Sequence, residues 1–134
     1  MVYSSYLRRL KQTANAAEAE LREGLTSEDI LLTDRMAQFV GIQSAGATQV
    51  RGNGALALTR RDLRFRMWVP NRRYDVSLDR ITAVGTTRSH LGKAVGADLL
   101  KVSFTNDQGA EDAIVWRVAK GPHAWITAIE EGRA

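Results

Sequence analysis

The sequence predicts a mainly β domain in which about seven antiparallel strands form a roll or barrel, with a capping C-terminal helix and an extra N-terminal helix. Two observations support this prediction. From residue 54 to residue 118, apolar and polar residues alternate at period two in short segments separated by turn residues. Helical spacing of apolar residues is confined to the two ends of the chain, so we expect helices only there.

The size and composition of the chain fit one globular domain. Its 134 residues give 14.8 kDa, with 44% hydrophobic and 25% charged residues. The absence of cysteine excludes disulfides and thiolate metal sites. The first residues include arginines where a signal peptide needs an apolar stretch, and no apolar run approaches the roughly 20 residues of a membrane span. We therefore expect a cytoplasmic protein, with peripheral attachment at the inner face of the membrane as an alternative.

Residues 4–23 are predicted to form a helix, with a serine as its N-cap and Gly24 as its stop. Its apolar stripe is thin and rich in alanine, and comprises Tyr6, Leu7, Leu10, Ala14, Ala17 and Leu21. Such a helix is expected to pack on its own domain or on another protomer. A helix lying on a membrane surface is the alternative, because basic residues lie beside tyrosines in its first half. We divide the chain into this helical segment, residues 1–24, and a β domain, residues 25–134.

The hairpin at residues 54–69 is the clearest strand signal. Its alternating apolar positions are Leu56, Leu58, Leu63, Phe65, Met67 and Val69. They define one buried face, and Arg64, Arg66 and Trp68 fall together on the opposite face. The hairpin is therefore expected to be apolar on one side and positively charged on the other.

The remaining elements follow in chain order from the same pattern. The spacing of Thr26 and Asp29 is typical of a helix cap. The predicted strands are residues 36–43, 54–59, 63–69, 74–79, 81–87, 99–105 and 113–118. The strand at 81–87 has two alternative inward faces, and the polar, glycine-containing segment 88–96 is predicted to be a loop. A final helix from Pro122 to about Glu131 has Trp125, Ile126 and Ile129 on its apolar face.

This set of segments resembles the pleckstrin-homology-like superfold, especially its bacterial PH-like and GRAM-type domains. The segments that show the resemblance are Glu28-Asp-Ile-Leu31, Gly54-Ala-Leu-Ala-Leu-Thr59, Leu63-Arg-Phe65, Val76-Ser-Leu78 with Ile81, Leu100-Lys-Val-Ser-Phe104 and Trp125. It covers about residues 28–131 and leaves the first helix as an addition.

The resemblance implies a binding scaffold for phosphoinositides, other anionic lipids, peptides or partner domains. Lipid-binding members carry a basic cluster around the first hairpin loop. Here the corresponding loop, before Gly54, contributes only Arg51, and the arginines occur further along the chain.

Positive charge is concentrated between Arg51 and Lys93, a segment with a net charge of +7, whereas the whole chain carries +4. An anionic or acidic partner would explain this asymmetry, and solubilising charge on the outer faces of hairpins is the other explanation. The candidate binding residues are Arg60, Arg61, Arg64, Arg66, Trp68, Arg72, Arg73, Arg88 and Lys93. In the predicted loop, Ser89 and His90 are further donors that an anion could use.

The three tryptophans have different expected roles. Trp116 and Trp125 share faces with aliphatic residues and are predicted to be in the core. Trp68 shares a face with two arginines, so it could stack beneath them, anchor a partner, or be covered by the N-terminal helix.

Nothing in the sequence predicts an enzyme, a metal site or a cofactor. His90 and His123 lie far apart without acidic or cysteine neighbours at ligand spacing, and surface positions are expected for both. Adjacent carboxylates such as Glu111 and Asp112 would point to opposite faces of a strand.

Three non-catalytic functions remain. The first is a PH-like module that binds a protein partner or self-associates through the N-terminal helix or an open sheet edge. The second is a peripheral binder of anionic lipid through the arginine-rich face. The third is weak nucleic-acid binding, which ranks third because few aromatic residues accompany the basic ones, and an enzyme ranks last.

Overall fold

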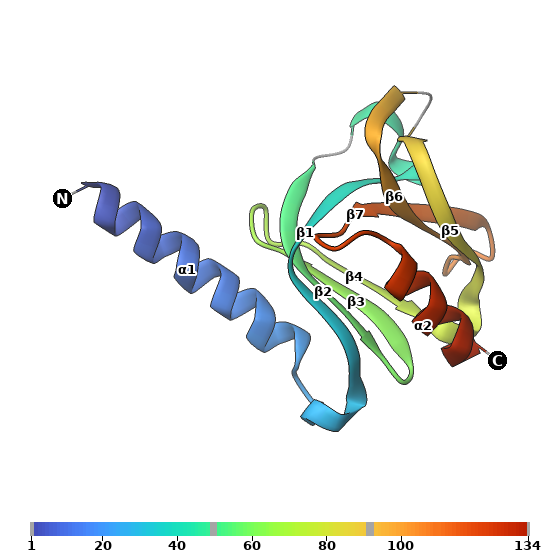
Figure 1. Ribbon diagram of the computed structural model, residues 1–134, viewed down its shortest axis with the longest axis horizontal. Helices are drawn as coiled ribbons and strands as arrows, with labels where there is room; N and C mark the ends of the chain where they lie inside the picture. Colours follow the sequence, from blue (N-terminus) through green and yellow to red (C-terminus); the bar gives the residue numbers. More distant parts are fainter. Residues whose placement is uncertain (1, 49–50, 91–92, 134) are drawn as a thin grey trace.

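The computed structural model describes residues 2–48, 51–90 and 93–133, without the side chains of residues 2–7, 47–48 and 93–96. Seven antiparallel strands form one sheet in the order β4-β3-β2-β1-β7-β6-β5. The strands are β1 (Ile30–Ile42), β2 (Gly52–Thr59), β3 (Asp62–Met67), β4 (Arg73–Ser77), β5 (Ile81–His90), β6 (Lys93–Thr105) and β7 (Glu111–Arg117). The sheet curls into a roll, with helix α2 (His123–Arg133) lying across it (Figure 1). The predicted fold class is confirmed.

Helix α1 (Val2–Leu21) matches the predicted N-terminal helix and projects away from the roll (Figure 1). A 3-10 turn, η1 (Ser27–Asp29), links it to β1. Here the backbone N–H of Thr26 donates to the Asp29 carboxylate at 3.0 Å, as the spacing predicts. The Thr26 hydroxyl also donates to this carboxylate, and the two hydrogen bonds lower the pKa of Asp29.

The β2–β3 hairpin pairs Leu56 with Phe65 and Leu58 with Leu63, and all four side chains are buried. This confirms the predicted apolar face as far as Met67. Val69 is an exception, because β3 ends at Met67 and the Val69 side chain is 73% exposed. Alternation therefore stops with the strand, two residues earlier than the sequence indicates.

β1 is longer than the predicted strand at 36–43 and pairs with β2 on one side and β7 on the other. Irregularities in its pairing interrupt the alternation before Ala37, which explains why its first half shows no clear period. Through β1, the hairpins of the two halves of the sheet share one core.

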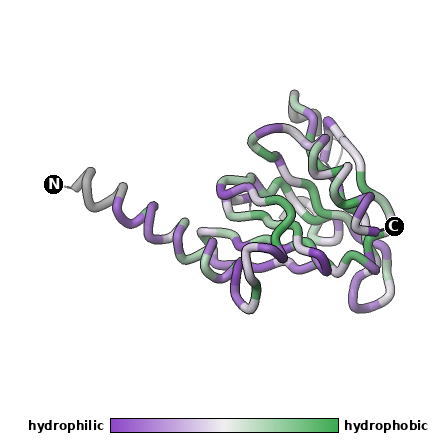
Figure 2. The backbone as a smooth tube through the Cα atoms, turned by 60° about the horizontal axis from the view of Figure 1, so that its bottom comes forward, coloured by the Kyte–Doolittle hydropathy of each residue, from purple (hydrophilic) through white to green (hydrophobic). Residues whose placement is uncertain are grey.

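The core lies between the inner faces of the sheet and α2 (Figure 2). Phe39 stacks on Tyr74 with 4.8 Å between ring centroids, and Phe65 packs against Trp116. Trp125 and Ile129 from α2 complete the cluster. Trp116 and Trp125 are thus core residues, as predicted.

In the predicted loop 88–96, residues 88–90 and 93–96 are strand, and residues 91–92 lie outside the described residues. His90 pairs with Lys93, and Ser89 with Ala94, so β5 and β6 extend well beyond the predicted strands. A pairing irregularity after Ile81 moves the inward positions from Ile81 to Val84, which explains why the sequence offered two inward faces. His90 was expected at the surface, but its side chain is only 8% exposed.

Candidate functional site

The outer face of β2 and β3 is covered by the C-terminal part of α1. Ala55 and Ala57 face outward from β2, and their small side chains let Leu21 of α1 pack directly against them. Leu21 and Ala17 are buried. The N-terminal helix is therefore docked on its own domain, one of the two arrangements expected for it.

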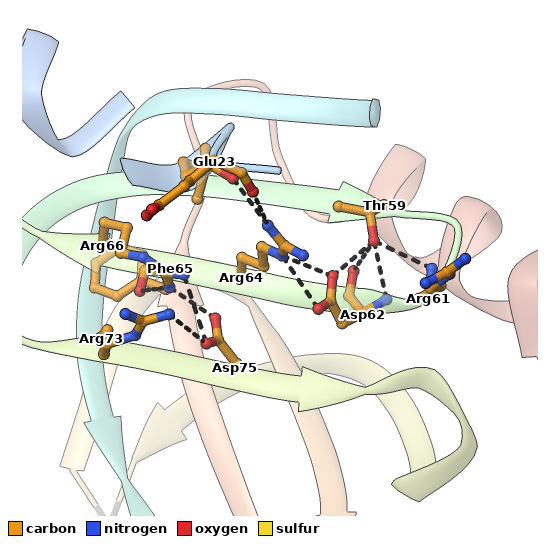
Figure 3. Close-up of polar contacts among 10 residues, drawn as sticks. Glu23, Thr59, Arg61, Asp62, Arg64, Phe65, Arg66, Arg73 and Asp75 are labelled. Atoms are coloured by element: carbon orange, nitrogen blue, oxygen red, sulfur yellow. Dashed lines mark hydrogen bonds and ion pairs between the residues drawn. The ribbon is translucent and has the colours of Figure 1, made fainter. Parts of the chain in front are cut away.

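Arg64 fastens the end of α1 to the sheet (Figure 3). Its Nη1 donates to the backbone carbonyls of Leu21 and Glu23, each at 3.3 Å, and its Nε pairs with Asp62 at 3.0 Å. A guanidinium at this position satisfies carbonyls that have no partner within the helix. Arg64 thus serves the contact between α1 and β3.

Arg66 is buried on the same outer face. Its side chain is 2% exposed, and its Nη1 donates to Asp75 at 2.7 Å and to the carbonyl of Phe65 at 3.0 Å. Arg73 approaches the same carboxylate at 3.2 Å (Figure 3). The expectation that the interleaved arginines form one solvent-facing surface is wrong for Arg66, because its guanidinium is buried and bonded to Asp75 of β4 and to a backbone carbonyl.

Trp68 is half-buried rather than displayed beside the arginines. Within the described part of the chain, neither its Nε1 nor the Nε of Arg66 has a hydrogen-bond partner, and both atoms are buried. Among the described residues, the Trp68 ring does not stack on an arginine.

Four of the exposed candidate arginines fall into two separate groups. Arg60 and Arg61 lie in the β2–β3 turn, whereas Arg72 and Arg73 lie around the start of β4. These groups are at opposite ends of β3, so the structure divides the predicted basic face.

The two remaining candidates belong to the β5–β6 hairpin. Arg88 pairs with Asp98 at 2.7 Å, which raises the pKa of Arg88. The side chain of Lys93 lies outside the described residues.

The part of α1 beyond its docked end offers a second candidate surface. Leu10 is 39% exposed, and its neighbours in the helix, Arg9, Lys11 and Gln12, are also exposed. Near the sheet, Arg35 of β1 holds α1 through Glu18 at 2.8 Å and Asn15 at 3.1 Å. The helix is thus fixed at one end and extends from the roll along the rest of its length (Figures 1 and 2).

A polar pocket of about 200 Å³ forms a third candidate on the outer face of the other half of the sheet. It is lined by Gln43, Thr87, Ser89, His90, Lys101, Ala113 and Val115. Burial, followed by the charges of Arg51 and Lys101, lowers the pKa of His90. Sequence reasoning included Ser89 and His90 among the donors but missed Lys101, which enters only through strand pairing.

Over the described residues, no group of three or more acidic, histidine or cysteine side chains could hold a metal ion. In the same part of the chain, no helix is both long and apolar enough to cross a membrane.

Comparisons with known proteins show relatives of the fold only. No family model matches the chain, and no curated protein resembles it in sequence. The crystal structure of the C-terminal domain of an unknown protein from Leishmania infantum is similar, with a TM-score of 0.57 and 12% identity over 93% of this chain and 99% of that one. A chain of the 8S snRNP assembly intermediate has a TM-score of 0.58 and 10% identity, over 81% of this chain and 84% of that one. The fold is therefore found in other solved proteins.

Proposed function

We propose that this chain is a non-catalytic interaction domain of the pleckstrin-homology-like kind, which binds a protein partner or a second copy of itself through the exposed length of α1. Seven antiparallel strands and a tryptophan-bearing helix packed on the roll support the scaffold part of this proposal. Catalysis plays no part in it.

The observation that carries the proposal is the docking of α1 by one end only. In the C-terminal part of α1, Ala17 and Leu21 are buried against the sheet. Leu10 belongs to the same apolar stripe of the helix, but 39% of its surface is exposed. An isolated helix of this length is marginal in water, so a partner along the projecting part would stabilise it. A helix bound through one apolar stripe is a recurrent mode of protein recognition.

The division of the exposed arginines favours a protein over a membrane. A basic residue near an anionic surface contributes about 1 kcal/mol, and only when it can reach that surface. Arg60 and Arg61 lie at the opposite end of β3 from Arg72 and Arg73, so one flat bilayer would not engage all four equally.

Two full-length variants test the proposal. Leu10→Glu places a charge on the projecting stripe, and Gln12→Glu places the same charge on an exposed residue about 200° around the helix. We expect Leu10→Glu to abolish the dimer mass in light scattering, or the capture of a specific protein from cell extract, and Gln12→Glu to retain it.

The circular dichroism of both variants should match that of the parent protein. If the parent is monomeric at all concentrations and captures the same proteins as Leu10→Glu, the proposal fails.

A further inference from the structure

We propose that the pocket between the ends of β1 and β5 and the middle of β6 binds a phosphate group. This site lies on the opposite half of the sheet from α1, and it is independent of the proposed protein-binding function. Its residues come from the three strands β5, β6 and β7 and from the turn after β1, which Figure 1 shows on the same side of the roll.

The pocket is lined mainly by groups that can donate hydrogen bonds. Lys101 brings an ammonium group, His90 an imidazole, and Ser89 and Gln43 a hydroxyl and an amide. Ala113 and Val115 form its apolar floor. Donors of this kind that converge on one small volume suit an oxyanion, because charge-assisted hydrogen bonds to phosphate oxygens are among the strongest in proteins.

The volume restricts the size of the ligand. Pockets for drug-sized molecules are usually about 300–1,000 Å³. At about 200 Å³, this pocket is smaller than that and fits a single phosphate group better than an extended molecule. The rest of a larger phosphorylated ligand would have to remain outside.

Among the described residues, the cations around the pocket, Lys101 and Arg51, make no ion pair with an acid within 4 Å. Neither residues 43–51 nor residues 84–97 include an aspartate or a glutamate. Asp98, the next residue, is held by Arg88 at 2.7 Å.

On the face of β7 that lines the pocket, the nearest acidic residue is Glu111, two positions before Ala113. Its carboxylate accepts a hydrogen bond from the Thr82 hydroxyl at 2.5 Å. The electrostatic potential at His90 is therefore positive, set by Arg51 and Lys101. The pKa of His90 is lowered by burial and by two nearby cations. A bound anion would favour the charged imidazolium and would therefore raise this pKa again.

The test is a titration of the full-length protein with inorganic phosphate, followed by NMR of the two histidine rings. We expect the His90 signals to shift in a saturable way and the pKa of His90 to rise. His123 is exposed at the start of α2 and serves as the control within the same molecule. Sodium chloride at the same ionic strength should leave both rings unchanged.

Two variants locate the site. Lys101→Ala should weaken phosphate binding about tenfold or more, because it removes a charge-assisted hydrogen bond. Lys120→Ala removes the same charge from an exposed position just after β7 and should have no effect. Equal thermal stability of the two variants would show that Lys101→Ala still folds.

Two further binding experiments distinguish a membrane lipid from a soluble metabolite as the source of the phosphate. Vesicles of phosphatidylcholine with phosphatidic acid present a phosphomonoester at a membrane, and glycerol 3-phosphate presents it in solution. Lys101-dependent binding to the vesicles assigns the site to a lipid headgroup, whereas binding of the soluble ester alone assigns it to a free metabolite. No saturable shift of His90 with any of these probes, or an equal shift with chloride, would overturn the proposal.

Discussion

Arg66 has a charge that is almost completely removed from water, and Asp75 is the carboxylate that compensates for it. The pair is asymmetric, because the Asp75 side chain remains 38% exposed and is shared with Arg73. Removing one member of a buried pair leaves an uncompensated charge, whereas replacing the buried charge by an apolar group of similar shape is often tolerated.

We therefore expect Asp75→Ala to lower the free energy of unfolding by about 2 kcal/mol or more, and Arg66→Met to cost much less. The double variant should recover most of the loss, since no buried charge remains. Urea unfolding of the parent and the three variants measures this cycle. A loss from Arg66→Met as large as that from Asp75→Ala would contradict the assignment.

At the scale of elements, two contacts set how closely the strands and α1 approach. Arg64 connects β3 to the carbonyl of Leu21, the last residue of α1, and to that of Glu23 just beyond it, and the small side chains of Ala55 and Ala57 leave room for Leu21. In the hairpin itself, Gly54 lies so close to β3 that a Cβ atom would collide with the carbonyl oxygen of Arg66 and lie 2.7 Å from Cζ of Phe65.

Gly54→Ala should accordingly reduce the free energy of unfolding by about 2 kcal/mol or more, because the backbone of the two strands would have to separate. Gly85→Ala is a matched control in another strand, since its Cβ would meet nothing within 4 Å. We expect that variant to be as stable as the parent or slightly more stable. Chemical denaturation compares the two, and equal stabilities would refute the proposed close approach.

At the scale of the whole molecule, the stability of the roll should depend on pH through His90. Burial and two nearby cations hold its pKa below the ordinary 6.5. Below pH 6.5 the unfolded chain therefore takes up a proton before the folded protein does, and the free energy of unfolding falls until the folded pKa is passed. Above 6.5 both states are neutral at this residue and it contributes no slope.

Urea unfolding between about pH 7 and pH 5 should thus show decreasing stability as the pH falls. His90→Gln should flatten this part of the profile, and His123→Gln should leave it unchanged, since His123 is exposed. The pKa of Asp29 is lowered from 3.8, so its titration falls outside this range. A profile that His90→Gln leaves as steep as before would rule out the buried imidazole as the cause.

Much of this architecture could be predicted from short-range pattern. Period two identified the β2–β3 hairpin and its inner face through Met67, and helical spacing identified both helices, because these periods follow directly from strand and helix geometry. The ends of elements were less predictable. β3 stops before Val69, and β5 and β6 extend into the segment predicted to be a loop, as far as His90 and from Lys93 onward, because strands also accept glycine and polar residues.

The sequence by itself determined the inner core, the β-rich class and the concentration of basic residues in the middle of the chain. Only the tertiary structure decided which outward positions remain in water. Arg66 and His90 both fall on faces that a strand pattern leaves open, yet both are buried. The physical reason is that the surroundings of an outward side chain come from segments distant in sequence, here Asp75 of β4 at Arg66, and Gln43 and Lys101 in the pocket that His90 lines, and no local period records these neighbours.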